Sequence, residues 1–138
     1  MSVEHFDVLE SLLPADITVF RGHAPDKPAE DDYPYIVLGG NPGTETGDSY
    51  AGNPDSLELR YKLTYAGLTF DSVLTVIRRA RAELVGQKLI VPGWSSGLLR
   101  HESLVDIRTD FDVTVPETSS HPLYAVDEFL LVASKISD

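Results

Sequence analysis

The stretch that decides the fold is Leu57-Glu58-Leu59-Arg60-Tyr61-Lys62-Leu63-Thr64-Tyr65. Apolar or aromatic residues fill its odd positions, and charged residues or threonine fill its even positions. Because successive side chains of a strand point to opposite faces, this alternation predicts a β-strand with one buried face and one face in water. Gly67 then turns the chain, and the period of the apolar residues changes from strand to helix.

A helix is predicted over residues 70–85, directly after this strand. Thr69 is placed to cap the first turn, Asp71 complements the helix dipole, and Gly86 ends the helix. Apolar residues at spacings of three and four give the helix one buried stripe. This stripe consists of Phe70, Val73, Leu74, Ile77, Ala80 and Leu84.

Upstream, the sequence predicts a short helix over residues 3–13 and a first strand over residues 17–21. Pro14 separates them, because proline stops a helix. Residues 35–38 predict a second strand that is apolar on both faces. Such a strand lies either in the middle of a sheet or with one face against another subunit. The sequence leaves both interpretations open.

Downstream, the sequence predicts strands over residues 88–91, 105–115 and 123–134, and a turn at residues 94–97. Alternation in the 105–115 strand predicts an inward-facing set of residues. This set is Val105, Ile107, Thr109, Phe111, Val113 and Val115.

These elements favour an α+β fold with a mixed, mostly antiparallel sheet. A main helix packs on one face of it, and a short helix precedes it. The length of 138 residues suits a single domain over residues 1–138.

A long connection separates the second strand from the deciding stretch. It covers residues 39–56 and is rich in glycine, proline, asparagine and serine. Connections of this length without structure of their own are uncommon in compact domains, and they are usually functional arms or disordered segments. We therefore expect a long flexible loop at residues 39–56.

The composition excludes several classes of function. The chain has no cysteine, which rules out disulfides, thiolate metal sites and cysteine nucleophiles. Its formal net charge of −11 opposes general binding to nucleic acid or anionic lipid. No apolar run is long enough to span a bilayer, and the first residues lack the features of a secretory signal. We expect no membrane partner, and a location in the cytoplasm of the producing cell.

The residues that can carry chemistry form no catalytic motif. Nucleophile-elbow, phosphate-loop and dinucleotide-binding patterns are all absent from the sequence. The histidines lack the paired spacing of metal ligands, and we expect all of them in surface loops. They are His5, His23, His101 and His121.

A small metal-dependent hydrolase remains an alternative. It would use Asp110, Asp112 and His101. The more ordinary interpretation of Asp106, Asp110 and Asp112 is the solvent-facing side of a strand.

The only basic cluster consists of Arg78, Arg79 and Arg81 in the main helix. At 100° per residue, Arg79 points away from the apolar stripe and Arg78 lies at its edge, whereas Arg81 falls inside it. Two interpretations of Arg81 are open. Its alkyl stem covers apolar surface while its guanidinium reaches water, or the guanidinium pairs with a carboxylate within the subunit or across an interface.

The order of short marks along nearly the whole chain resembles the tail-terminator proteins of long-tailed (siphovirus-type) bacteriophages. The marks are Leu12-Leu13-Pro14, Val19-Phe20-Arg21-Gly22, Tyr33-Pro34-Tyr35-Ile36-Val37-Leu38, Thr64-Tyr65-Ala66-Gly67, Thr69-Phe70-Asp71-Ser72-Val73, Gly86-Gln87-Lys88-Leu89 and Tyr124-Ala125-Val126-Asp127-Glu128-Phe129.

This resemblance implies a ring, usually a hexamer, that caps the tail tube, stops its polymerisation and joins it to the head connector. The expected partners are therefore other copies of the chain, the tail tube protein and the head–tail connector protein. The negative charge would suit a lumen through which genomic DNA passes without specific binding. The expected place is the virion, after assembly in the host cytoplasm.

The resemblance also implies no catalytic residues and no cofactor or metal. A closed ring needs a heterologous interface, and a loop arm or an edge strand can make one. Our candidate interface residues lie in the 39–56 loop and in the arginine cluster. They are Asn41, Pro42, Thr44, Glu45, Asp48, Tyr50, Arg78 and Arg81.

Three alternatives remain from the sequence. A neck or tail-completion protein is the first, because the marks are shared loosely among virion joining proteins. The hydrolase described above is the second, and an unrelated monomeric binding module is the third.

Overall fold

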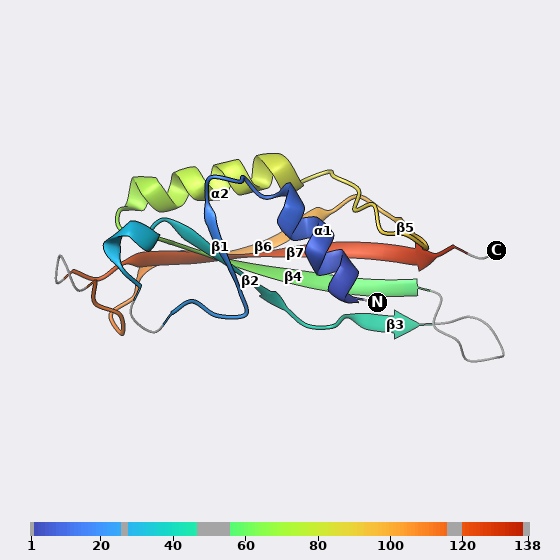
Figure 1. Ribbon diagram of the computed structural model, residues 1–138, viewed down its shortest axis with the longest axis horizontal. Helices are drawn as coiled ribbons and strands as arrows, with labels where there is room; N and C mark the ends of the chain where they lie inside the picture. The colour runs from blue at the N-terminus through green and yellow to red at the C-terminus, as the bar shows by residue number, and fades with distance from the viewer. Residues whose placement is uncertain (1, 26–27, 47–55, 116–119, 137–138) are drawn as a thin grey trace.

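The computed structural model describes residues 2–25, 28–46, 56–115 and 120–136 (Figure 1). The helices are α1 (Ser2–Leu12), the short 3₁₀ helix η1 (Glu30–Asp32) and α2 (Phe70–Leu84). The strands are β1 (Thr18–Arg21), β2 (Tyr35–Gly40), β3 (Thr44–Thr46), β4 (Ser56–Gly67), β5 (Trp94–Ser96), β6 (Arg100–Thr109) and β7 (Leu123–Lys135).

One mixed sheet organises the described residues. Its strand order is β1-β2-β4-β7-β5, with β3 paired to β4 and β6 paired to β7. Only β1 and β2 run parallel, and every other pairing among the described strands is antiparallel. The predicted α+β class is confirmed, and α2 lies along one face of the sheet (Figure 1).

Strand β4 has the predicted alternation. Its odd-numbered residues, from Leu57 to Tyr65, are at most 1% exposed and form the centre of the main core. Its partner β7 runs beside it along the whole of β4 and contributes Phe129 and Leu131 to the same core. Glu58 and other even-numbered side chains face solvent on the far side of the sheet.

Helix α2 covers this core. The hydroxyl of Thr69 accepts a hydrogen bond from the backbone N–H of Ser72 at 3.1 Å, so the predicted cap is confirmed. The buried stripe differs from the prediction at its start, because Phe70 is 55% exposed while Val76 is buried. Val73, in the same first turn, is buried in the main core, so the exposure of Phe70 is confined to the first residue of the helix.

Strand β2 is central, which decides between the two interpretations left open by the sequence. It lies between β1 and β4. Ile36 and Leu38 enter the main core on the helix side of the sheet. On the other side, Tyr35 joins a second cluster with Tyr33 and Val115. The strand is apolar on both faces because both faces are covered within the chain.

The 39–56 segment is not one unstructured loop where the structure describes it. Strand β2 continues to Gly40, and β3 pairs with the first residues of β4, from Thr44 opposite Glu58 to Thr46 opposite Ser56. The expectation of a long loop is therefore wrong at residues 39–40 and 44–46. Residues 47–55 lie outside the described part of the chain.

The region after α2 also differs from the prediction. Residues 88–91 form only one bridge, from Lys88 to Leu98, whereas the predicted turn at residues 94–97 contains β5. Strand β5 forms because its backbone pairs with the distant end of β7, from Lys135 to Ala133. A local pattern cannot reveal such a partner.

Strand β6 breaks the predicted alternation of residues 105–115. The strand ends at Thr109, and its register against β7 shifts twice, between His101 and Ser103 and between Val105 and Arg108. Each shift inserts an extra residue and exchanges the inward and outward faces. Phe111 was predicted to face inward, but it lies in the turn beyond the end of β6 and is 75% exposed; Val105, within β6, is also exposed.

No helix in the described part of the chain is both long enough and apolar enough to cross a lipid bilayer.

Candidate interaction surface

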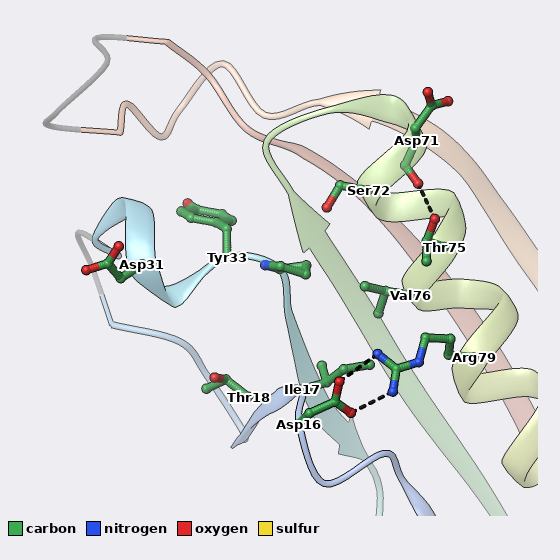
Figure 2. Close-up of a pocket in the computed structure, with 11 residues that line it drawn as sticks. Asp16, Ile17, Thr18, Asp31, Tyr33, Asp71, Ser72, Thr75, Val76 and Arg79 are labelled. Carbon is green, nitrogen blue, oxygen red and sulfur yellow. Dashed lines mark hydrogen bonds and ion pairs between the residues drawn. The ribbon is translucent and has the colours of Figure 1, made fainter.

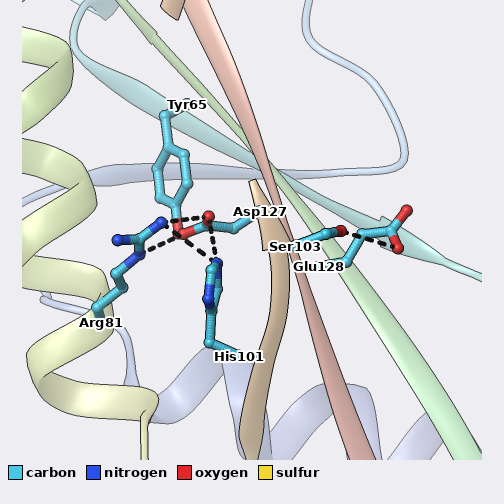
Figure 3. A network of polar contacts seen from close by, with 6 residues as sticks. All are labelled: Tyr65, Arg81, His101, Ser103, Asp127 and Glu128. Carbon is cyan, nitrogen blue, oxygen red and sulfur yellow. Dashed lines mark hydrogen bonds and ion pairs between the residues drawn. The ribbon is translucent and has the colours of Figure 1, made fainter. Parts of the chain in front are cut away.

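Polar side chains from four elements meet at one buried carboxylate (Figure 3). Asp127 of β7 is 0% exposed. Arg81 of α2 donates from Nε to Oδ2 at 2.9 Å and from Nη2 to Oδ1 at 2.7 Å. The hydroxyl of Tyr65 in β4 donates to Oδ2 at 2.9 Å, and Nε2 of His101 in β6 lies 2.9 Å from Oδ1. We call these four residues the Asp127 network.

The geometry fixes the proton on His101. A carboxylate oxygen only accepts, so the Nε2 atom that faces Asp127 carries hydrogen. Nη2 of Arg81 lies 3.2 Å from the same nitrogen. Both of these nitrogens are donors, so they do not bond to each other, and Asp127 is the common acceptor of the network.

The network keeps Asp127 charged in spite of its burial. Burial raises the pKa of this carboxyl, but hydrogen bonds from Arg81, His101 and Tyr65 together outweigh burial, and the pKa lies below its ordinary value of 3.8. Burial, reinforced by the carboxylate, raises the pKa of the Tyr65 phenol. Near neutral pH the site therefore holds a carboxylate and a neutral phenol.

The contacts decide between the interpretations of Arg81. Its guanidinium makes a two-pronged bond to Asp127 within the chain, and the hydrogen bond to that carboxylate raises the pKa of the guanidinium. Arg81, one of the candidate interface residues, is therefore already paired with a carboxylate of its own chain. The network links α2 to β4, β6 and β7, which makes it a structural clamp.

The residues of the hydrolase alternative do not come together. His101 pairs with Phe129 on β7, and Thr109 pairs with Leu123. Six residues of strand separate these partners, which is about 20 Å at 3.3 Å per residue. Asp110 and Asp112 lie beyond Thr109, so they cannot share a metal ion with His101. Among the described residues, no group of three or more His, Asp or Glu is placed to hold one.

The expectation that every histidine lies in a surface loop is wrong for two of them. His5 is 0% exposed in α1, and its ring meets Trp94 edge-on at 5.3 Å between centroids. His101 lies in β6 within the Asp127 network. His121 is half-buried beside the backbone carbonyl of Val113, with 2.7 Å between Nδ1 and that oxygen.

A groove of about 430 Å³ lies between α2 and the segment that carries β1 and η1 (Figure 2). Ile17 and Val76 form its apolar part. Arg79 crosses it and holds both oxygens of Asp16, at 3.0 and 2.6 Å, and this bond lowers the pKa of the Asp16 carboxyl. Arg79 thus joins the start of β1 to α2 and is not free to hold a ligand.

A second groove, of about 320 Å³, lies beside α1, and we call it the α1 groove. Apolar side chains of Val3, Phe6 and Leu38 line it. So do Asn41 and Pro42, two of the candidate interface residues. The side-chain oxygen of Asn41 accepts a hydrogen bond from the N–H of Gly43 at 2.9 Å, which shapes the turn at the edge of this groove.

The other candidate interface residues are scattered. Thr44 and Glu45 lie in β3, and Thr44 is exposed. Arg78 is exposed on α2. Asp48 and Tyr50 lie outside the described residues. Of the candidates that the structure describes, Asn41 and Pro42 line the α1 groove, and the others do not.

Large apolar side chains are exposed at several places on the described surface. The most exposed are Ile90 at 77% and Phe111 at 75%. Others at or above 47% are Val3, Phe70, Val85, Leu98, Val132 and Ile136. Exposed apolar groups that lie near one another mark contact surfaces, whereas isolated ones are ordinary.

No protein-family profile matches the sequence, and no curated protein matches it.

Sequence reasoning missed the partner of Arg81, although a signal was present. On β7, Asp127 shares its face with Ala125, Phe129 and Leu131, which are buried. Asp127 at an inward-facing strand position and Arg81 inside an apolar helical stripe would each be an unpaired buried charge. Paired with each other, they neutralise that charge.

Proposed function

We propose that the chain is a structural subunit of the tail-terminator type, which works by forming a ring with copies of itself. The observation that carries the proposal is the pairing of an apolar groove with exposed apolar side chains elsewhere on the same molecule. The groove includes Val3 and Pro42, and the exposed side chains include Ile90 and Leu98. Such a surface suits contact between subunits, because it removes apolar area from water.

The use of the charged residues supports a structural role. Two arginines of the basic cluster, Arg79 and Arg81, are bound to Asp16 and Asp127 in the same chain. The residues that suggested a metal-dependent hydrolase are spread along β6 and the turn after it. The α1 groove and the exposed apolar side chains can bind another subunit through apolar contacts. The residues of the hydrolase alternative do not converge on one point.

The arrangement of elements fits the resemblance on which the proposal rests. A short helix and two strands precede a long connection, and a strand leads through Thr69 into the main helix. In this proposal the ring, a hexamer in such proteins, caps the tail tube and meets the head–tail connector in the virion. The net charge of −11 suits a lumen that repels the passing DNA.

Electron microscopy of the purified protein, with the tube protein of the same phage as a partner, tests this proposal. We expect rings, and we expect added rings to shorten tubes that grow from purified tube protein. A protein that stays monomeric at high concentration, alone and with tube protein, contradicts the proposal. Rings that leave tube length unchanged contradict the terminator role and point to a neck subunit.

A further inference from the structure

We propose that copies of the chain join head to tail, with residues 85–98 of one copy docked in the α1 groove of the next. We call residues 85–98 the donor segment. This inference rests on the proposed ring and names the two surfaces that build it.

The α1 groove is suited to receive an apolar side chain. Val3 on its rim is 55% exposed, and Phe6 and Leu38 lie deeper. Bare backbone forms part of its wall at Gly40, where a Cβ would lie 2.5 Å from the carbonyl oxygen of Arg60 and 3.3 Å from Cζ of Phe6. Because Gly40 has no side chain, α1 and the end of β2 can pack closely there. The groove beside them has a volume of about 320 Å³.

The donor segment combines exposure with an unusual lack of acidic residues. Ile90 is 77% exposed, Leu98 53% and Val85 47%. The longest stretch of the chain without Asp or Glu runs from residue 84 to residue 101 and contains this segment. Its charged residue is Lys88, an exposed side chain. In a chain of net charge −11, this is a surface that a second copy can approach with little repulsion.

Charge favours the donor segment over Phe111, the other most exposed apolar residue. Asp7 and Glu10 lie on α1 beside the groove, where Arg21, which lines it, offsets only part of their charge through bonds at 2.6 Å to Asp7 and 3.3 Å to Glu10. Lys88 complements this acidic rim. Phe111 is as exposed as Ile90, but Asp110 and Asp112 flank it, and the same rim would repel them.

The two surfaces lie on opposite edges of the sheet, and α1 lies between them, because its Val3 and Phe6 line the groove while its His5 meets Trp94 of the donor segment at 5.3 Å between ring centroids. Arg21 of β1 and the end of β2 line the groove, and β1 is the first strand in the sheet order. The donor segment contains β5, the last strand in that order. Figure 1 shows β5 and β3 on opposite sides of the β4–β7 pair. Contacts between unlike surfaces on opposite edges repeat from copy to copy, and they close into a ring if the rotation allows it.

Disulfide trapping tests this contact, because the natural chain has no cysteine. The test chain carries Val3→Cys together with Ile90→Cys. After mild oxidation we expect a ladder of covalent multimers on a non-reducing gel, ending in a closed ring. Each single variant can form no species larger than a dimer. The matched control chain carries Val3→Cys with Phe111→Cys, because Phe111 is about as exposed as Ile90, at 75% against 77%, and we expect no ladder from it.

A charge exchange provides a second test at exposed positions that leave the core intact. We expect Lys88→Glu to raise the concentration at which rings form by about tenfold, because it opposes the acidic rim. Adding Asp7→Lys to the same chain should restore assembly, and thermal melting confirms that each variant is folded.

The outcomes separate this inference from the proposed function. If the natural chain forms rings but the Val3 and Ile90 pair gives no ladder, or if both cysteine pairs give equal ladders, the docking arrangement is overturned while the ring proposal stands. Unchanged assembly of Lys88→Glu overturns it as well. If the natural chain never assembles, the proposed function itself fails.

Discussion

Asp127 shows how one residue can fix the relative positions of several elements. Its carboxylate accepts hydrogen bonds from Arg81 on α2, Tyr65 on β4 and His101 on β6. A buried charge is tolerated only where donors replace the water that it has lost. The clamp therefore stabilises the fold as long as every donor stays in place, and it becomes a liability when one partner is removed.

Replacing Asp127 should destabilise the protein strongly. We expect Asp127→Ala to lower the free energy of unfolding by about 3 kcal/mol, because Arg81 and Tyr65 lose their shared acceptor in a largely buried site. Urea denaturation measures this loss. Glu128→Ala is the matched control, since Glu128 lies next to Asp127 on the other face of the strand and its hydrogen bond to Ser103 is long, at 3.4 Å. Equal losses for the two variants would show that the network adds no stability.

The network should also make stability depend on pH in the acid range. The folded state lowers the pKa of Asp127, so the stability that it contributes is complete above the ordinary carboxyl value of 3.8. That contribution is lost as the pH falls through the lower folded-state value. The difference in unfolding free energy between the natural chain and Asp127→Asn should therefore be constant near neutral pH and shrink on acidification. A difference that grows in acid has the wrong sign for this account.

At the scale of elements, strand β4 and helix α2 follow their local sequence closely. The alternation of residues 57–65 is a property of consecutive positions, and so is the cap at Thr69. Both could be predicted because backbone geometry alone imposes their period. Strand β2 was recognised from a continuous apolar run instead of an alternation, and the sequence did not say what covers its two faces.

The helix cap gives a prediction at this scale. Thr69→Ala should lower the free energy of unfolding by about 1 kcal/mol, because the N–H of Ser72 loses its acceptor. Thr69→Asp should keep most of the stability, since a carboxylate accepts the same bond. Thr75→Ala is the control, because the Thr75 hydroxyl bonds only the carbonyl of Asp71 in its own helix. If the Thr69 and Thr75 variants melt alike, the cap does not stabilise α2.

The elements that the sequence missed depend on distant partners. Strand β5 exists through its pairing with the end of β7. The alternation predicted for residues 105–115 fails because β6 has a register shift between Val105 and Arg108 and ends at Thr109. The partner of Arg81 lies 46 residues away. Asn41 and Pro42 were singled out from their loop composition, but the groove that they line needs α1, which a local pattern cannot place.

For the whole molecule, charge is the dominant property. With a net charge of −11, most of the surface repels phosphate, and the donor segment is the exception. The proposed ring depends on the same charge. Copies of the chain repel one another over most of their surface, so they can make contact only where acidic side chains are absent or face a basic side chain.

The net charge predicts that the protein does not bind double-stranded DNA. Fluorescence anisotropy of a labelled duplex at physiological salt should stay unchanged as the protein is added up to high micromolar concentration. The physical reason is that phosphate binding needs released counterions and a cationic surface, which this chain lacks. Tight, salt-dependent binding would contradict a lumen that lets DNA pass.

The position of β7 has a consequence for synthesis. This strand is the last described element along the chain, yet it is flanked by β4 on one side and by β5 and β6 on the other. As the polypeptide leaves the ribosome, β4 therefore waits for its neighbour until residues 123–135 have emerged. The sheet of the described residues therefore stays incomplete until residues 123–135 have been synthesised.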